Sequence, residues 1–173
     1  MRMGLPAAVL AASLLLPVSQ SVCAQTTASS REQIEAVIDT FGKAIVNKDV
    51  AGFMQLFLRE DISWTVVYTD DSVRRYNAGL KDTATPLATK VQRASPRAFI
   101  ESIARSRQVK SETFSNVRID TDGEVAHVWF DYAFMTGDYK NAWGKEGWQL
   151  VRTDKGWKIA AVTWSAEENP VPR

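Results

Sequence analysis

The sequence predicts an α+β domain in which two or three helices precede a curved, mostly antiparallel β-sheet. Apolar residues recur at helical spacing between Ile34 and Phe57. From Phe114 onward, apolar and polar residues alternate in segments separated by turns rich in Asp and Gly. Helices followed by a run of strands are typical of the α+β class, and 173 residues are enough for one domain.

Residues 1–24 have the pattern of a secretory signal peptide. Arg2 is basic, residues 5–16 are apolar or small, and Ala24 provides a small residue for cleavage. The apolar run is shorter than the ~20 residues that span a bilayer. We expect cleavage after Ala24 and a periplasmic or secreted product that is not held in a membrane; the alternative is a buried N-terminal helix. Cys23, the single cysteine, would leave with the signal, which suits an oxidising compartment.

Two helices are predicted at the start of the mature chain. Residues 25–30 form a polar, flexible leader without periodicity, and Ser30 is placed to cap the first helix. Asp49 is placed to cap a second, shorter helix. The apolar positions on which these helices depend are Ile34, Val37, Ile38, Phe41 and Ile45 in the first and Val50, Phe53, Met54 and Phe57 in the second.

A strand, an insertion and a third helix come next. Residues 61–68 alternate and predict a strand, and residues 69–72 predict a turn. Residues 73–94 are polar and carry several basic side chains, which indicates a loop long enough to cover a site as a flap. Its basic residues either bind an acidic ligand or are simply solvated. Ser95 and Pro96 mark the start of the third helix.

Four strands complete the predicted domain. They lie at residues 114–119, 125–135, 139–153 and 157–164, and a polar tail occupies residues 166–173. Each pair of strands is joined by a short turn, so the four strands are expected to form an antiparallel meander. The sequence shows no internal repeat.

The composition excludes several classes of function. Lys and Arg number 21 and Asp and Glu number 20, so the chain lacks the cationic excess that nucleic-acid binding requires. One histidine and one cysteine cannot form a multi-histidine or cysteine-rich metal site. A glycine-rich phosphate loop and a G-x-S-x-G motif are both absent from the sequence. We therefore expect no cofactor and no metal.

The order of elements and several strand motifs resemble the nuclear transport factor 2-like superfamily. The motifs lie at residues 114–119, 122–126, 129–132, 148–153 and 156–159. The resemblance covers residues 31–165 and is greatest to small secreted bacterial members without assigned function. It implies a cone-shaped fold shared with ketosteroid isomerases and SnoaL-like polyketide cyclases, with an internal, mostly apolar cavity for a small molecule. It also implies a homodimer formed through the sheet.

Asp131 is the candidate catalytic residue. It lies among aromatic residues, in the segment 129–132, where burial would raise the pKa of its carboxyl group and suit it to proton transfer. Alternation places Phe130 and Tyr132 on the more apolar face of this strand and Asp131 on the other. The alternative is therefore that Asp131 points outward and pairs with a basic residue of a neighbouring strand.

The remaining candidate site residues are expected to bind the ligand. Tyr68 is placed to donate a hydrogen bond to an oxyanion, with core packing as the alternative. His127 lies ~13 Å from Asp131 along the strand, too far for a direct pair, and a surface or interface position is its alternative. Thr163 stands near a position where relatives often carry a histidine. The complete set of predicted ligand-binding residues is Trp64, Tyr68, His127, Tyr132, Trp148 and Thr163.

Three functions are compatible with this pattern. The first is an exported, non-catalytic domain that binds a small apolar molecule. The second is an isomerase, cyclase or dehydratase in which Asp131 transfers a proton. The third is a structural or interaction module whose cavity is filled by its own side chains. The missing histidine at Thr163 favours the first function.

Overall fold

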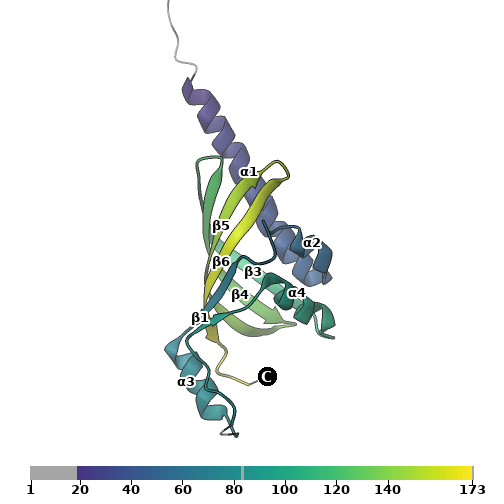
Figure 1. Ribbon diagram of the computed structural model, residues 1–173, viewed down its shortest axis with the longest axis vertical. Helices are drawn as coiled ribbons and strands as arrows, with labels where there is room; N and C mark the ends of the chain where they lie inside the picture. Colours follow the sequence, from purple (N-terminus) through teal and green to yellow (C-terminus); the bar gives the residue numbers. More distant parts are fainter. Residues whose placement is uncertain (1–18, 83, 173) are drawn as a thin grey trace, which may run out of the picture.

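The computed structural model describes residues 19–82 and 84–172, and within them it confirms the α+β class. Three helices lie against one face of a curved sheet, and a fourth helix, α3, lies beyond the end of the sheet that is farthest from the start of α1 (Figure 1). The elements are α1 (Ser19–Asn47), α2 (Val50–Met54), β1 (Ser63–Tyr68), α3 (Asp70–Gly79), β2 (Val91–Arg93), α4 (Pro96–Arg105), β3 (Lys110–Thr121), β4 (Val125–Thr136), β5 (Tyr139–Thr153) and β6 (Gly156–Glu168).

The six strands form one sheet in the order β2-β1-β6-β5-β4-β3. Strands β3 to β6 form the antiparallel meander that the hairpin turns predict. Strand β1 pairs with β6 in parallel, and β2 pairs with β1 in antiparallel orientation. The first strand of the chain therefore lies beside the last one, which brings the segment after β1 next to the carboxyl end of β6.

Helix α1 begins earlier than the sequence pattern predicts. Residues 25–30, predicted as a flexible leader, are helical, and Ser30 is a buried residue inside the helix rather than its N-cap. The segment from Ser19 to Phe41 contains no Gly or Pro, so nothing in it terminates a helix. Residues 1–18, which hold most of the predicted signal peptide, lie outside the described residues. None of the helices in the described ranges is long and apolar enough to cross a membrane.

The other two predicted helix starts are confirmed. Asp49 caps α2, because its side chain accepts a hydrogen bond from the backbone N–H of Gly52 (2.9 Å). Ser95 caps α4 by accepting from the N–H of Ala98 (3.1 Å), and Pro96 occupies the first helical position. Both caps lie where the sequence places them.

The predicted turn at residues 69–72 and the predicted loop at 73–94 are wrong in part. Thr69 caps α3 by accepting a hydrogen bond from the N–H of Ser72 (3.1 Å), and residues 91–93 form β2. Helix α3 has almost no buried side chain, so it lacks the apolar stripe that reveals a helix in a sequence. Its N-cap and its contacts with β6 support it instead.

The hydrophobic core lies between the inner face of the sheet and α1, α2 and α4. Aromatic rings link these layers. The ring centroid of Phe41 on α1 lies 4.7 Å from that of Phe53 on α2 and 4.8 Å from that of Trp148 on β5. Such tilted aromatic pairs add to the free energy gained by burying their area. The core thus holds α1 across the middle of the sheet.

A β-bulge in β6 changes which residues face the core. Leu150 of β5 pairs with Ile159, whereas the adjacent Gln149 pairs with Ala161, so Ala160 is an extra residue in β6. Ile159 faces the core before the bulge, and Val162 faces it afterwards. The predicted alternation of this strand therefore fails beyond Ala160. The strand also continues to Glu168, into the predicted tail.

Candidate functional site

A pocket of about 120 Å³, here called the inner pocket, lies on the concave face of the sheet. Strands β1, β4, β5 and β6 supply most of its wall, β3 supplies one acidic residue, and α1 and α4 each supply a phenylalanine. Its lining residues are Phe41, Trp64, Val66, Tyr68, Phe99, Glu112, Tyr132, Phe134, Ala142, Glu146, Trp164, Ala166 and Glu168.

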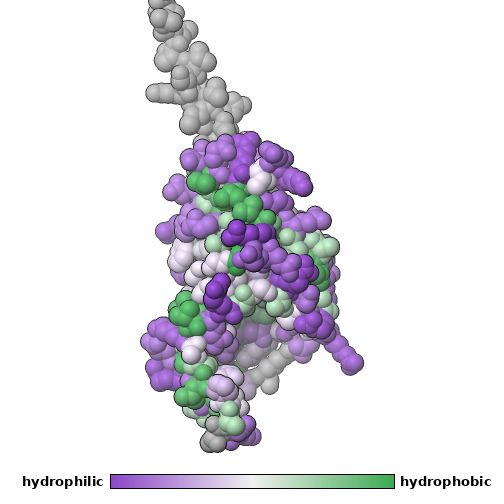
Figure 2. All heavy atoms as spheres, viewed as in Figure 1, coloured by the Kyte–Doolittle hydropathy of each residue, from purple (hydrophilic) through white to green (hydrophobic). Residues whose placement is uncertain are grey.

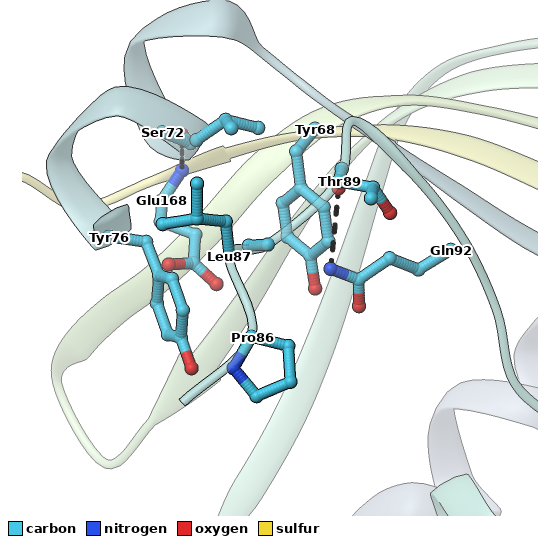
Figure 3. Close-up of a pocket in the computed structure, with 10 residues that line it drawn as sticks. Tyr68, Ser72, Tyr76, Pro86, Leu87, Thr89, Gln92 and Glu168 are labelled. Carbon is cyan, nitrogen blue, oxygen red and sulfur yellow. Dashed lines mark hydrogen bonds between the residues drawn. The ribbon is translucent and has the colours of Figure 1, made fainter. Parts of the chain in front are cut away.

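A second pocket, of about 340 Å³ and here called the mouth pocket, lies between α3, the segment 86–89 and the end of β6. Figure 3 shows Tyr68 and Tyr76 on either side of the Glu168 carboxylate, with Pro86 and Leu87 in front. Tyr68 and Glu168 line both pockets, so the two are neighbours. The lining residues are Tyr68, Ser72, Val73, Tyr76, Pro86, Leu87, Ala88, Thr89, Gln92 and Glu168.

Hydrogen bonds hold α3 against the end of β6. The hydroxyl of Ser72 accepts from the backbone N–H of Glu168 (2.9 Å). The guanidinium of Arg75 donates to Glu167 Oε1 (2.6 Å) and to the carbonyl oxygen of Glu168 (2.7 Å). The hydroxyl of Thr69 also donates to Glu167, and these two donors lower the pKa of the Glu167 carboxyl group. We call this set of bonds among Thr69, Ser72, Arg75, Glu167 and Glu168 the α3 latch.

Two carboxyl groups, those of Glu112 and Glu146, meet at the inner pocket. Glu146 is 4% exposed and stands opposite Phe130 on β4 and Trp164 on β6. Its Oε1 accepts a hydrogen bond from Trp148 Nε1 (2.5 Å), and its carboxyl group shares a hydrogen bond with that of Glu112. We call Glu112 and Glu146 the carboxyl pair.

Burial sets the protonation of this pair. Desolvation raises the pKa of Glu146 to about 7, although hydrogen bonds from Trp148 and Glu112 oppose the rise. Desolvation and then the nearby charge of Glu146 raise the pKa of Glu112 well above its usual range. The pair therefore retains a proton at neutral pH and can both donate and accept hydrogen bonds.

Two tyrosines complete the polar groups of the inner pocket. The hydroxyl of Tyr132 donates to the carbonyl oxygen of Ser165 (3.0 Å), and the residue is 6% exposed. Desolvation, followed by the charges of Glu146 and Glu112, raises the pKa of Tyr132. Desolvation and the charge of Glu168 raise the pKa of Tyr68. Both phenols are therefore neutral hydrogen-bonding groups.

The structure brings only half of the predicted ligand-binding residues to the inner pocket. Trp64, Tyr68 and Tyr132 line it, and their role in binding stays a prediction. Trp148 is fully buried and reaches the pocket only through its hydrogen bond to Glu146. Thr163 is exposed on the opposite face of β6, because the bulge at Ala160 shifts the alternation, so its predicted place in the pocket is wrong.

His127 also lies away from the pocket, on the outer face of β4. A hydrogen bond joins its Nδ1 to Gln149 Nε2 (2.9 Å), and its ring stacks on that of Trp129. It therefore occupies the surface position that was its alternative. Among residues 19–82 and 84–172, no group of three or more His, Cys, Asp or Glu side chains is arranged to hold a metal ion.

Asp131 does not occupy the position that proton transfer in the pocket requires. It lies on the outer face of the sheet, where it forms an ion pair with Lys145 of β5 and accepts a hydrogen bond from Asn116 Nδ2 (2.6 Å). The Asn116 hydrogen bond and then Lys145 lower the pKa of its carboxyl group. The alternative reading of Asp131, an outward side chain paired with a neighbouring basic residue, is the one that the geometry supports.

The carboxyl pair is the part of the site that sequence reasoning missed. Glu146 shares its strand face with Trp148 and Leu150, so alternation from these two apolar residues was a usable signal. Glu112 precedes residue 114, where the predicted strand starts, and so no face was assigned to it. Strand β3 in fact begins at Lys110.

Comparisons with known proteins support the fold. No family model matches the chain, and no curated protein matches it. An NTF2-like protein with a cystatin-like fold from Novosphingobium aromaticivorans is similar with a TM-score of 0.59 and 12% identity, covering 86% of this chain and 88% of that one. An NTF2-like superfamily protein from Salmonella enterica is similar with a TM-score of 0.56 and 15% identity, covering 84% and 96%.

A third solved structure adds the same result. A variant of Rv3472 from Mycobacterium tuberculosis, described as a protein of unknown function, is similar with a TM-score of 0.58 and 16% identity, covering 85% of this chain and 77% of that one. At such identities the likeness concerns the fold, and function depends on the site. The chain has the nuclear transport factor 2-like fold, as its strand motifs led us to expect.

Proposed function

We propose that this domain binds a small, largely apolar molecule in the inner pocket, with the mouth pocket as its entrance. The observation that carries the proposal is the aromatic wall of the inner pocket. Seven of its lining residues are Phe, Tyr or Trp: Phe41, Trp64, Tyr68, Phe99, Tyr132, Phe134 and Trp164. An apolar wall with a few convergent polar groups is the usual composition of a small-molecule site.

The test is to map the binding of two small neutral probes, 2-phenylethanol and acetophenone, by NMR chemical shifts. We expect saturable shifts at backbone amides beside the inner pocket. The Ala142→Leu variant, which adds a side chain inside the pocket, should reduce affinity at least about tenfold by steric exclusion. Ala36→Leu on the exposed face of α1 is the matched control. Saturable shifts confined to the outer face of the sheet, or no binding, would contradict the proposal.

A second candidate function is acid–base catalysis by the carboxyl pair. A specific observation favours it: Glu146 has a pKa of about 7 and shares a hydrogen bond with Glu112 beside the pocket. A group with a pKa near the working pH both accepts and returns a proton efficiently. In this reaction a carboxylate of the pair removes a proton from the carbon beside a carbonyl group, which leaves an enolate, and the pair then returns a proton exchanged with solvent to the same carbon.

Deuterium exchange tests this second candidate. Acetophenone in D₂O at pH 7 should gain deuterium at its methyl carbon faster with the protein than with buffer alone. Glu146→Gln should lower that rate at least about a hundredfold, because general acid–base catalysis typically contributes this much. Asp131→Asn, on the outer face, is the control and should not change it. An exchange rate equal to that of buffer would leave binding as the function.

We further propose that the chain is exported and cleaved after Ala24. The charged start, short apolar run and small residue at Ala24 support this. Mass spectrometry of the protein from the periplasmic fraction and the medium should give a chain that begins at Gln25. A full-length chain in the cytoplasm would contradict it.

We also propose a homodimer formed through the outer face of the sheet. Trp129 is 41% exposed on that face, beside His127, which supports an interface there. Sedimentation analysis should give a dimer, and Trp129→Glu should dissociate it. A monomer at all concentrations would contradict the proposal.

A further inference from the structure

The two pockets contain acidic groups and no basic ones. Glu112 and Glu146 line the inner pocket, and Glu168 lines both pockets. Among the described residues, no Lys, Arg or His side chain lines either pocket. On β3, Lys110 precedes Glu112 by two residues, but its Nζ donates to the hydroxyl of Thr136 (2.7 Å) and it lines neither pocket. The described residues that line the two pockets therefore supply acidic groups and no basic side chain.

None of the described basic residues of segment 73–94 lines either pocket. Arg75 belongs to the α3 latch and pairs with Glu167. Arg74 pairs with Asp71, and Lys90 pairs with Asp70 (2.8 Å). The prediction that this segment recruits an acidic ligand at the mouth of the cone therefore has no support from the geometry. Figure 2 shows hydrophobic side chains exposed among hydrophilic ones over α3 and the segment after it.

We infer that the ligand of this site is an organic cation, a small ammonium compound with an aromatic or aliphatic body. The inference rests on the proposed binding function and adds the charge of the ligand. Glu146, which is 4% exposed and has an aromatic residue opposite it on each neighbouring strand, is the charge partner of the ammonium group, together with Glu112. The aromatic wall holds the apolar body.

Two physical effects favour a cation in this environment. An ammonium group attracts the faces of aromatic rings, and the attraction is stronger where water is excluded. A carboxylate in an apolar pocket is stabilised by an opposite charge far more than by a neutral group. An anionic ligand meets the reverse situation, because it would lie beside Glu112, Glu146 and Glu168 with no basic residue in the described pocket lining.

The mouth pocket extends the same recognition to the entrance. The Glu168 carboxylate lies between the rings of Tyr68 and Tyr76, with Leu87 over it (Figure 3). A carboxylate beside two aromatic rings is an entry site for a cation. A cationic ligand would therefore meet an acidic group at the entrance, Glu168, and again at the end of its path, at the carboxyl pair.

Binding of a cation is coupled to loss of a proton. The titratable groups that line the inner pocket are Glu112 of β3, Tyr132 of β4, Glu146 of β5, Glu168 of β6 and Tyr68 of β1. Outside the lining, the charged residue Lys110 lies two positions before Glu112 on β3. Helices α1 and α4 contribute only Phe41 and Phe99. Since the carboxyl pair retains a proton at neutral pH, the ammonium group binds best after that proton leaves. The affinity for a cation should therefore rise with pH between about 5.5 and 8.

The experiment compares three ligands of the same shape, the phenethylammonium ion, 2-phenylethanol and phenylacetate, by titration calorimetry at pH 8. We expect the cation to bind at least about tenfold more tightly than the alcohol, and phenylacetate more weakly than either. The cation should bind more weakly at pH 5.5 than at pH 8, whereas the alcohol should bind similarly at both. Calorimetry in two buffers should show proton release only with the cation.

Two charge-neutral variants localise the effect. Glu146→Gln keeps an oxygen acceptor for Trp148 Nε1 and should lower the affinity for the cation about tenfold, with less than about a twofold change for the alcohol. Glu168→Gln, at an exposed residue that joins the α3 latch only through its backbone, should weaken binding of the cation by a smaller factor. Glu35→Gln on the exposed face of α1 is the matched control and should change neither.

The outcomes separate this inference from the proposed function. Equal affinity for the cation and the alcohol, with both bound in the inner pocket, would overturn the inference and leave the binding function standing. Tighter binding of phenylacetate would also overturn it. Failure of all three ligands to bind would overturn both.

Discussion

The two faces of the sheet place the same chemical group in opposite environments. Glu146 on β5 faces inward, opposite Phe130 and Trp164, and burial raises the pKa of its carboxyl group to about 7. Asp131 on neighbouring β4 faces outward, beside Lys145 and Asn116, and its pKa is lowered. A single step in strand alternation therefore decides whether a carboxylate is a surface ion or a protonated pocket group.

The largest expected contrast concerns tryptophans on the two faces. Trp148→Ala should lower the free energy of unfolding by about 3–5 kcal/mol, because Trp148 is fully buried against Phe41 and donates to Glu146. Trp129→Ala on the outer face should cost about 1 kcal/mol or less, since the residue is 41% exposed. Urea unfolding measures both. Equal losses would contradict the division between the faces.

The pH dependence of stability sharpens the contrast for carboxylates. The pKa of Glu146 is raised in the folded state, so the unfolded chain loses this proton first, and stability falls as pH rises from about 4.5 to about 7. The loss should be roughly 3 kcal/mol if the shift is fully expressed. Glu146→Gln removes this titrating group and should make this part of the curve less steep, and Glu112, whose pKa is also raised, accounts for the slope that remains. The free energy of unfolding is measured by urea unfolding from pH 4.5 to 8. If it depended on pH equally in Glu146→Gln and in the wild-type protein, Glu146 would not titrate in this range.

A substitution can weaken the α3 latch without altering either face of the sheet. Arg75→Ala removes the donor to Glu167 Oε1 and to the carbonyl oxygen of Glu168. Amide hydrogen exchange in α3 should accelerate about tenfold, because two hydrogen bonds that favour the closed state are lost, whereas exchange in β4 and β5 should not change. Lys43→Ala, which removes an exposed ion pair on α1, is the control. Equal acceleration throughout the sheet would indicate global destabilisation instead.

The smallest expected effect comes from Asp131. Its pKa is lowered, so the stability that it contributes is present above its ordinary pKa and is lost as pH falls through the acid range. Asp131→Asn should therefore slightly lower stability above the acid range and remove this loss in acid. Ligand affinity at pH 7 should change less than about twofold, because the residue lies on the face opposite the pocket. A larger loss of affinity would show that Asp131 does contribute to the ligand-binding site.

Elements with a clear apolar period were predictable from the sequence. Apart from the earlier start of α1, helices α1, α2 and α4 and strands β1 and β3 to β6 lie near their predicted positions, since each contributes buried apolar residues to the core. Helix α3 was missed because it buries almost nothing and owes its place to Thr69 and Arg75, which pair with residues at the far end of the chain. Such long-range hydrogen bonds leave no local pattern in a sequence.

The site was less predictable than the fold. Trp64, Tyr68 and Tyr132 were identified because aromatic residues at alternate strand positions indicate an apolar face. The carboxyl pair was missed because Glu112 and Glu146 are separated along the chain and become partners only when β4 brings β3 and β5 together. A rule that favours apolar residues for the interior does not find the charged exceptions that make a site.

The β-bulge at Ala160 determines the chemistry of the pocket wall. Because side chains alternate, every position from Val162 to Glu168 takes its side of the sheet from that bulge. If the same residues paired without the bulge, Thr163, Ser165 and Glu167 would turn inward, and Trp164 and Glu168 would turn outward. An aromatic, acidic lining would then give way to a hydroxyl-bearing one, and Glu167 would leave its partner Arg75. In this fold one local irregularity of a strand can therefore set a binding specificity that would otherwise require several substitutions.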